Sequence, residues 1–175
     1  MELDAAKFGS FDILYAWGVL HHTGSIFEAV SSALRCLAPG GVAILTLYRR
    51  TKLCGFWRVE KRWYSRAPAW AQGLARGVYV ALHWASLILR GRSVRRHIEN
   101  YPKENRGMDY FRDVHDWLGG YPYESVSYGE IKDFMAARGL EEVRSFVRPP
   151  GLGLLGSGND EYVFQRKQPP PLGTP

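Results

Sequence analysis

The chain of 175 residues contains only two cysteines, Cys36 and Cys54. Two isolated cysteines provide neither a disulfide framework nor the ligand spacing of a zinc site, so the sequence favours a reducing, cytoplasmic compartment. The N-terminus, MELDAAKFGS, lacks both the basic start and the apolar core of an export signal. The apolar fraction of 46% and the aromatic fraction of 14% are typical of a globular protein and exclude a disordered chain.

Acidic residues are scarce in one long segment. Residues 49–99 hold twelve Lys or Arg against two acidic residues, Glu60 and Glu99, which gives this segment a charge of +10. The net charge of the whole chain is only +6, so the remainder is slightly acidic. The basic character therefore belongs to one part of the protein and must be explained there.

A strand, a helix and a second strand occupy residues 10–48. Residues 11–15 form a short apolar run rich in β-formers. Ser25 and Glu28 have the spacing of a capping box and predict a helix start, and Pro39-Gly40-Gly41 predicts the helix end. Residues 42–47 are again continuously apolar. Apolar strands that alternate with helices predict a parallel sheet with a right-handed crossover.

Two blocks of this sequence resemble a known family. FDILYAWGVLHHTG, followed by a helix and LAPGGVAILTLY, resembles the fourth strand, fourth helix and fifth strand of a class I S-adenosylmethionine-dependent methyltransferase domain. RGMDYFRDVHDWLGGYPYE resembles the downstream part of one bacterial branch of that superfamily. The resemblance implies an α/β fold, a Rossmann-like three-layer sandwich with a helical insertion over about residues 50–120.

The resemblance also implies that an N-terminal half is missing. The Gly-rich loop and the acidic residue with which the family holds its cofactor are expected upstream of Phe11, where only ten residues stand. We expect residues 1–167 to form one truncated domain and residues 168–175 to be a disordered tail. Strands are expected near 11–16, 42–48, 141–148 and 161–167. The last should lie between the second and third, antiparallel to both, and the first should be an open edge.

Candidate cofactor residues follow the first strand directly. Ligands of open α/β sheets bind at the carboxyl ends of the strands. By resemblance, Trp17, Gly18, Val19 and Leu20 would line the methionine and adenine side of an S-adenosylmethionine site, with Gly18 allowing close approach of the backbone. The alternative is a strand that simply turns here, with Trp17 packed in the core.

The candidate catalytic residue is His21, whose imidazole could act as a general base. A structural hydrogen bond to the loop backbone is the alternative role. His22, Tyr48 and Tyr121 are candidates for the substrate side, and aromatic core packing is the alternative for both tyrosines. Direct in-line methyl transfer needs alignment and exclusion of water more than side-chain chemistry. We therefore expect neither a catalytic triad nor a metal.

The basic segment predicts a long helix from about residue 69 to residue 90. Its polar residues form one narrow seam, which indicates burial of the rest in protein or in lipid. A membrane span needs about 20 residues, but Arg76 and His83 at mid-span disfavour one. We favour a lid over a substrate site and retain peripheral membrane contact through residues 50–97. Nucleic acid is a less favoured partner for these basic and aromatic residues.

The sequence GLGLLG at residues 151–156 matches the GxGxxG pattern but predicts a hairpin loop, because a strand and not a helix follows it. The function predicted is S-adenosylmethionine-dependent methyl transfer to a small-molecule substrate, and a lipophilic substrate is left open. Whether the truncated chain is an active enzyme is also left open. The alternative is a non-catalytic relic or interaction module whose cationic aromatic helices contact an anionic membrane, a partner or nucleic acid.

Overall fold

The computed structural model describes residues 5–105, 107–149 and 151–168. The chain packs as two compact units. The sheet unit comprises the residues up to Cys54 and those from Tyr123 onward, and the helical unit comprises Gly55–Pro122. Of the tail predicted from residue 168, residues 169–175 lie outside the described part of the chain.

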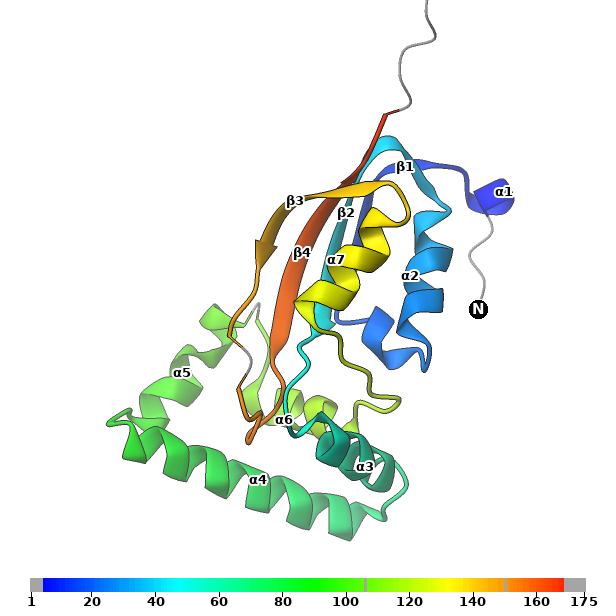
Figure 1. Cartoon of the computed structure of the whole chain (residues 1–175). Coiled ribbons are helices and arrows are strands. Elements are labelled where there is room, and N and C mark those ends of the chain that lie inside the picture. Colours follow the sequence, from blue (N-terminus) through cyan, green and yellow to red (C-terminus); the bar gives the residue numbers. More distant parts are fainter. Residues whose placement is uncertain (1–4, 106, 150, 169–175) are drawn as a thin grey trace, which may run out of the picture. The chain divides into compact units, whose positions relative to one another are not determined.

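The sheet unit is built on four strands in the order β1-β2-β4-β3 (Figure 1). They are β1 Phe11–Trp17, β2 Leu37–Tyr48, β3 Leu140–Phe146 and β4 Asn159–Arg166. β1 and β2 pair in parallel, and β4 runs antiparallel to both β2 and β3. This confirms the predicted place of the last strand and the predicted position of β1 at the end of the sheet.

The start of β2 differs from the prediction. Helix α2, Ile26–Leu34, ends before Pro39, and Pro39, Gly40 and Gly41 lie inside β2. Phe11 pairs with Leu37 and Ile13 with Val42, so residues 38–41 bulge opposite Asp12. Gly40 has φ +76°, and a Cβ on Gly41 would lie 2.9 Å from the Ala38 carbonyl oxygen. The glycines therefore permit a bulge here and do not end the helix.

Ser127 and Glu130 have the same capping-box spacing as Ser25 and Glu28, and these two sequence-based candidates have different outcomes. Ser25 occupies the N-cap position of α2, but its side chain makes no capping hydrogen bond, so the box with Glu28 is wrong. Ser127 does cap α7, Tyr128–Ala136. The Ser127 backbone N–H donates to Glu130 Oε2 at 2.8 Å, and the Glu130 N–H donates to Ser127 Oγ at 3.3 Å. This reciprocal pair satisfies two free donors at the helix start.

Helices α2 and α7 pack on one face of the sheet. The core between them consists of buried aliphatic and aromatic side chains, including Val30, Leu34, Leu45, Leu47, Ile131, Met135, Tyr162 and Phe164. Because side chains alternate along a strand, Ile13 and Tyr15 point to the opposite face, where they are 65% and 60% exposed. The β1 end of that face is thus open to solvent.

The helical unit contains α3 Cys54–Tyr64, whose first residue still belongs to the sheet unit, together with α4 Ala69–Leu89, α5 Val94–Glu104 and α6 Tyr110–Gly119. The bounds of α4 match the predicted long helix, whereas α5 was not predicted. Asp109 caps α6 by accepting the backbone N–H groups of Phe111 and Arg112. Among the described residues, no helix is both long enough and apolar enough to cross a bilayer.

Candidate functional site at the carboxyl end of the parallel strands

The loop after β1 begins with a glycine in a conformation that other residues avoid. Gly18 has φ +71°, and a Cβ built on it would meet no atom within 4 Å. The space beside this backbone is therefore open. Trp17 is half-buried with its ring 6.1 Å from that of Tyr15, Val19 is exposed, and Leu20 belongs to the hydrophobic core. Contact of these four residues with a cofactor stays a prediction.

The tertiary structure brings three of the predicted site residues together. His21 and His22 lie in a single 3-10 turn, Leu20–His22 (η1), and Tyr48 is the last residue of β2. The His21 ring lies 3.7 Å from the Tyr48 ring and 4.5 Å from the His22 ring, between centroids. His21 is 1% exposed, whereas His22 is half-buried. His22 is consequently the more accessible imidazole of the two.

A segment distant in sequence packs beside these rings. The Glu124 N–H donates to the His21 carbonyl at 3.1 Å, and the Val126 N–H donates to the Tyr48 carbonyl at 3.0 Å. The Tyr123 ring lies 5.2 Å from the Tyr48 ring, between centroids. Residues 123–126 therefore connect the ends of both parallel strands. Sequence reasoning missed Tyr123, although it directly follows the Gly-Gly-Tyr-Pro motif.

Cys54 is the second residue that sequence reasoning missed. Its Sγ lies 3.2 Å from Tyr123 Oη and accepts the Thr51 N–H at 3.1 Å. Burial alone would raise the pKa of the Cys54 thiol, but hydrogen bonds with Ser125, Thr51 and Tyr123 together lower it below the ordinary value. A single cysteine has no spacing pattern, so the sequence held no signal for this environment.

A buried ion pair ties the same edge of the sheet together. Arg49 Nη2 lies 2.6 Å from Asp160 Oδ1, and the two side chains are 13% and 1% exposed. The Asp160 carboxylate also accepts the Arg148 N–H at 3.2 Å. The pair joins the residue after β2 to the start of β4, directly beside Tyr48. It thereby fixes the strand end on which the candidate site rests.

Tyr121, the remaining predicted substrate residue, belongs to the helical unit and is partly exposed. Its role on the substrate side stays a prediction. The glycine-rich residues 151–156 connect β3 to β4 without a helix, as predicted for a hairpin loop.

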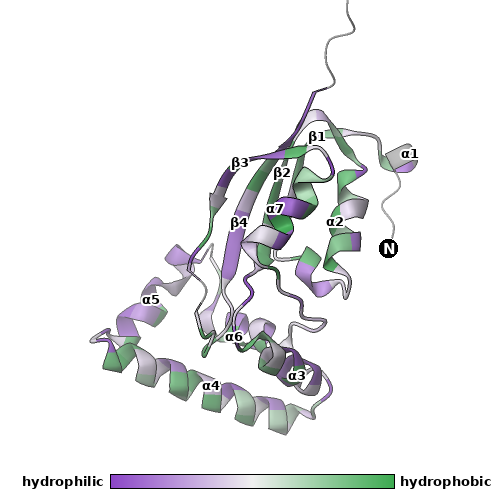
Figure 2. Cartoon of the chain, in the orientation of Figure 1, coloured by the Kyte–Doolittle hydropathy of each residue, from purple (hydrophilic) through white to green (hydrophobic). Residues whose placement is uncertain are grey.

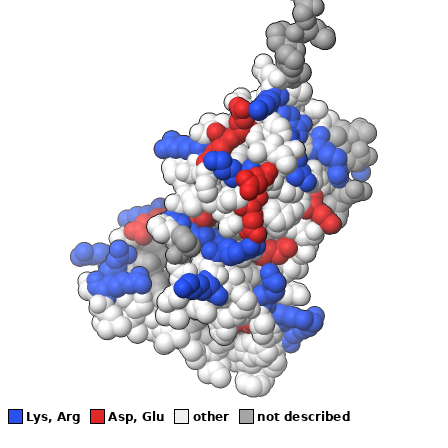
Figure 3. Space-filling model, in the orientation of Figure 1, with Lys and Arg blue, Asp and Glu red and all other residues white. Residues whose placement is uncertain are grey.

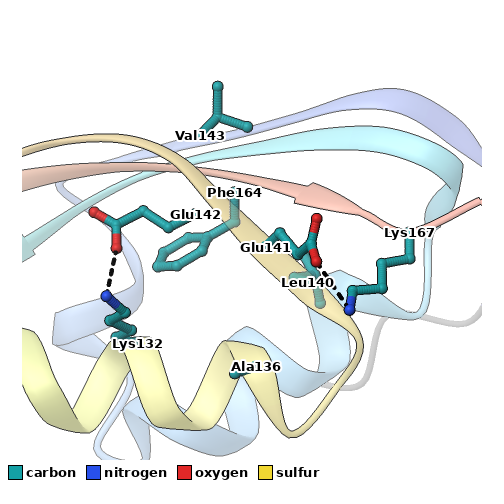
Figure 4. A pocket seen from close by; sticks show the side chains of 8 residues that line it. All are labelled: Lys132, Ala136, Leu140, Glu141, Glu142, Val143, Phe164 and Lys167. Carbon is teal, nitrogen blue, oxygen red and sulfur yellow. Dashed lines mark ion pairs between the residues drawn. The ribbon is translucent and has the colours of Figure 1, made fainter.

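A hollow of about 490 Å³ lies between α7 and β3, away from the candidate site (Figure 4). Two ion pairs cross it: Lys132 Nζ lies 3.4 Å from Glu142 Oε2, and Lys167 Nζ lies 2.9 Å from Glu141 Oε1. Leu140, which lines the hollow, pairs with Arg166 at the C-terminal end of β4. This end of β4 lies beside Val42 of β2, so the hollow is at the opposite edge of the sheet from Tyr48. Its charges neutralise each other, and we assign it no ligand.

No protein-family model and no curated protein sequence matches the chain. Several solved structures do. PKMT2 from Rickettsia typhi in complex with AdoHcy superposes with a TM-score of 0.57 at 13% identity, over 96% of this chain and 38% of that one. A second structure of PKMT2 from Rickettsia typhi superposes with a TM-score of 0.51 at 12% identity, over 94% of this chain and 37% of that one. An O-methyltransferase family protein from Burkholderia thailandensis gives 0.44 at 13% identity, over 95% and 34%.

The fold is α/β and Rossmann-like. The chain spans little more than a third of the length of the structures that it resembles. At 12–13% identity the likeness concerns the fold alone.

Proposed function

We propose that the chain is the C-terminal portion of a class I S-adenosylmethionine-dependent methyltransferase that acts on a small molecule by direct in-line transfer. The observation that carries the proposal is the sheet. Its order, β1-β2-β4-β3 with β4 antiparallel, places an open glycine turn and a group of aromatic rings at the carboxyl ends of two parallel strands. A protein of similar fold has been solved with AdoHcy. A non-catalytic interaction module is the less favoured alternative.

The residues after β1 fit the methionine and adenine side of such a cofactor. The space beside Gly18 lets a ligand approach the backbone closely, and the exposed Val19 and half-buried Trp17 supply apolar surface next to it. When bound, S-adenosylmethionine supplies an already activated methyl group. The protein then has to hold the acceptor in line with that group and exclude water, which an apolar and aromatic wall does.

On the substrate side we assign His22 and Tyr48 as contacts. His21 is buried against the Tyr48 ring and its carbonyl accepts the Glu124 N–H. This makes it a positioning residue that orients Tyr48, in place of the general base suggested by its type alone. The function needs no proton transfer by His21, because a neutral or ionised acceptor can attack a sulfonium methyl directly once aligned.

The proposal is tested by measuring AdoHcy binding calorimetrically with two matched glycine variants. Gly18 and Gly139 have φ of +71° and +74°, and a Cβ on either would meet no atom within 4 Å. Alanine should therefore strain both backbones equally. We expect Gly139→Ala to bind AdoHcy like the unmodified chain and Gly18→Ala to bind at least roughly tenfold more weakly, a difference of about 1.4 kcal/mol.

Either of two results would count against the proposal. Equal AdoHcy affinity of both variants would show that the loop after β1 does not contact the cofactor. A chain that melts cooperatively but binds no AdoHcy would show that this portion has no cofactor site of its own.

A further inference from the structure

Helix α4 is held with its polar side toward its own unit. Gln72 Nε2 donates to the Tyr64 carbonyl at 3.1 Å, and Arg76 Nη1 donates to the Tyr64 hydroxyl at 3.0 Å. Further along, His83 Nδ1 lies 2.8 Å from the Tyr110 hydroxyl. Both tyrosines are buried. These hydrogen bonds, spread over several helical turns, fix the rotation of α4 about its axis.

The opposite side of α4 is consequently an exposed apolar face. Its large side chains are between 52% and 88% exposed, and none of its members is charged or polar: Leu74, Gly77, Val78, Ala81, Leu82, Ala85, Ile88 and Leu89. We call these eight residues the α4 apolar face. At 1.5 Å per residue it extends for roughly 22 Å along the helix. Figure 2 shows the hydrophobic residues recurring along the whole of α4.

This arrangement is the reverse of an ordinary surface helix, which turns its apolar stripe to the core. Rolling α4 to bury the stripe would break the hydrogen bonds of Gln72, Arg76 and His83. Helix α3 of the same unit has further exposed apolar side chains, Phe56, Val59 and Trp63. Exposed apolar surface on this scale marks an interaction site.

The charge around the face identifies the partner. Residues 55–122 contain twelve Lys or Arg and six Asp or Glu, a net charge of +6. Exposed arginines follow the C-terminal end of α4, among them Arg90, Arg92 and Arg96, and others lie on and after α3, including Arg62 and Arg66. In Figure 3 the surface at the foot of the view, where α4 runs, is almost entirely white, with blue Lys and Arg side chains to both sides.

We propose that the α4 apolar face rests on the surface of a membrane that contains anionic lipid. Interfacial helices have this arrangement, in which apolar side chains insert at the headgroup boundary and arginines lie beside them. The exposed Trp63 and Trp70 suit the same boundary. A second copy of the chain is a poorer occupant, because pairing two such faces would bring the surrounding arginines of both copies together. The inference does not depend on the proposed methyl transfer.

Flotation of the full chain with vesicles tests the proposal. The first vesicle preparation contains phosphatidylcholine alone. In the second preparation, phosphatidylserine replaces part of the phosphatidylcholine. The chain should float with the anionic vesicles and much less with the neutral ones, and added salt should weaken its binding. Leu74→Gln with Leu82→Gln should reduce binding by at least roughly tenfold, since two exposed leucines lose their transfer into the apolar boundary.

The matched control is Leu152→Gln with Leu154→Gln, which changes two equally exposed leucines of the sheet unit. This variant should bind like the unmodified chain. Because all four leucines are exposed, circular dichroism should show unchanged folding. Arg92→Gln with Arg96→Gln should remove only the preference for phosphatidylserine. The proposal would be overturned if both double leucine variants lost vesicle binding equally, or if the unmodified chain did not float with either vesicle preparation. A dimer that Leu74→Gln with Leu82→Gln dissociates, without vesicle binding, would assign the face to a second copy.

Discussion

Asp160→Asn tests how the candidate site is held at the end of β2. The Asp160 carboxylate is 1% exposed and pairs with Arg49, whose guanidinium is 13% exposed. Asparagine keeps the shape of aspartate and a hydrogen-bond acceptor but leaves the Arg49 charge buried without its counter-ion. Breaking a buried pair from one side costs about 3–5 kcal/mol. We expect the lower end, about 3 kcal/mol, because the amide oxygen still accepts hydrogen bonds.

A loss of that size is a large part of the 5–15 kcal/mol by which a typical domain is stable, so it should be plain in urea unfolding followed by far-ultraviolet circular dichroism. The double variant Arg49→Gln with Asp160→Asn removes both charges and should cost less than the sum of the two single changes. Glu141→Gln is the control, because its ion pair with Lys167 is exposed on both sides, at 67% and 62%. It should change stability by less than about 1 kcal/mol.

The reasoning would be refuted if Asp160→Asn cost no more than Glu141→Gln. The pair would then contribute no more than a surface contact. Strict additivity of the two single changes would also contradict a direct interaction between Arg49 and Asp160.

Two further predictions concern other buried contacts. Burial lowers the pKa of the Lys61 ammonium well below 10.5, although the charge of Glu60 opposes this. Above neutral pH the unfolded chain therefore binds more protons than the folded chain, so the free energy of unfolding should rise with pH toward about pH 10. In thermal melts at several pH values, Lys61→Met should flatten this rise. An unchanged dependence of melting temperature on pH would contradict the prediction. Gly153 has φ +74°, and a Cβ there would lie 2.2 Å from Thr51 Oγ1. In urea titrations Gly153→Ala should cost about 1–3 kcal/mol more than Gly139→Ala, which has the same φ but open space, and equal costs would show that the Thr51 contact yields freely.

Short-range patterns account for the elements that were predicted well. Ser127 and Glu130 form their capping box because both partners lie within one turn of the same helix. The apolar runs of residues 11–15 and 42–47 form strands as predicted, because residues of this composition favour extended backbone. The order of the strands came from the resemblance to methyltransferases and is confirmed by the pairing.

Predictions failed where a distant contact changed the outcome. Pro39-Gly40-Gly41 has the composition of a helix end, but pairing of Phe11 with Leu37 begins the strand before it. The catalytic role of His21 stays a prediction, and the tertiary structure adds only that its ring lies 3.7 Å from the Tyr48 ring, between centroids. Tyr123 and Cys54 entered the site only because the segment after the helical unit pairs with the end of β2.

The sequence by itself determined the bounds of the long helix α4 and the segregation of positive charge into one segment. These are properties of neighbouring residues, and hydropathy and charge record them directly. Only the tertiary structure decided which way α4 faces. A narrow polar seam on an apolar helix looks the same whether the seam meets water or the helix's own unit, and the buried hydroxyls of Tyr64 and Tyr110, far from their partners in sequence, draw the seam inward. The apolar face is left outward for that reason.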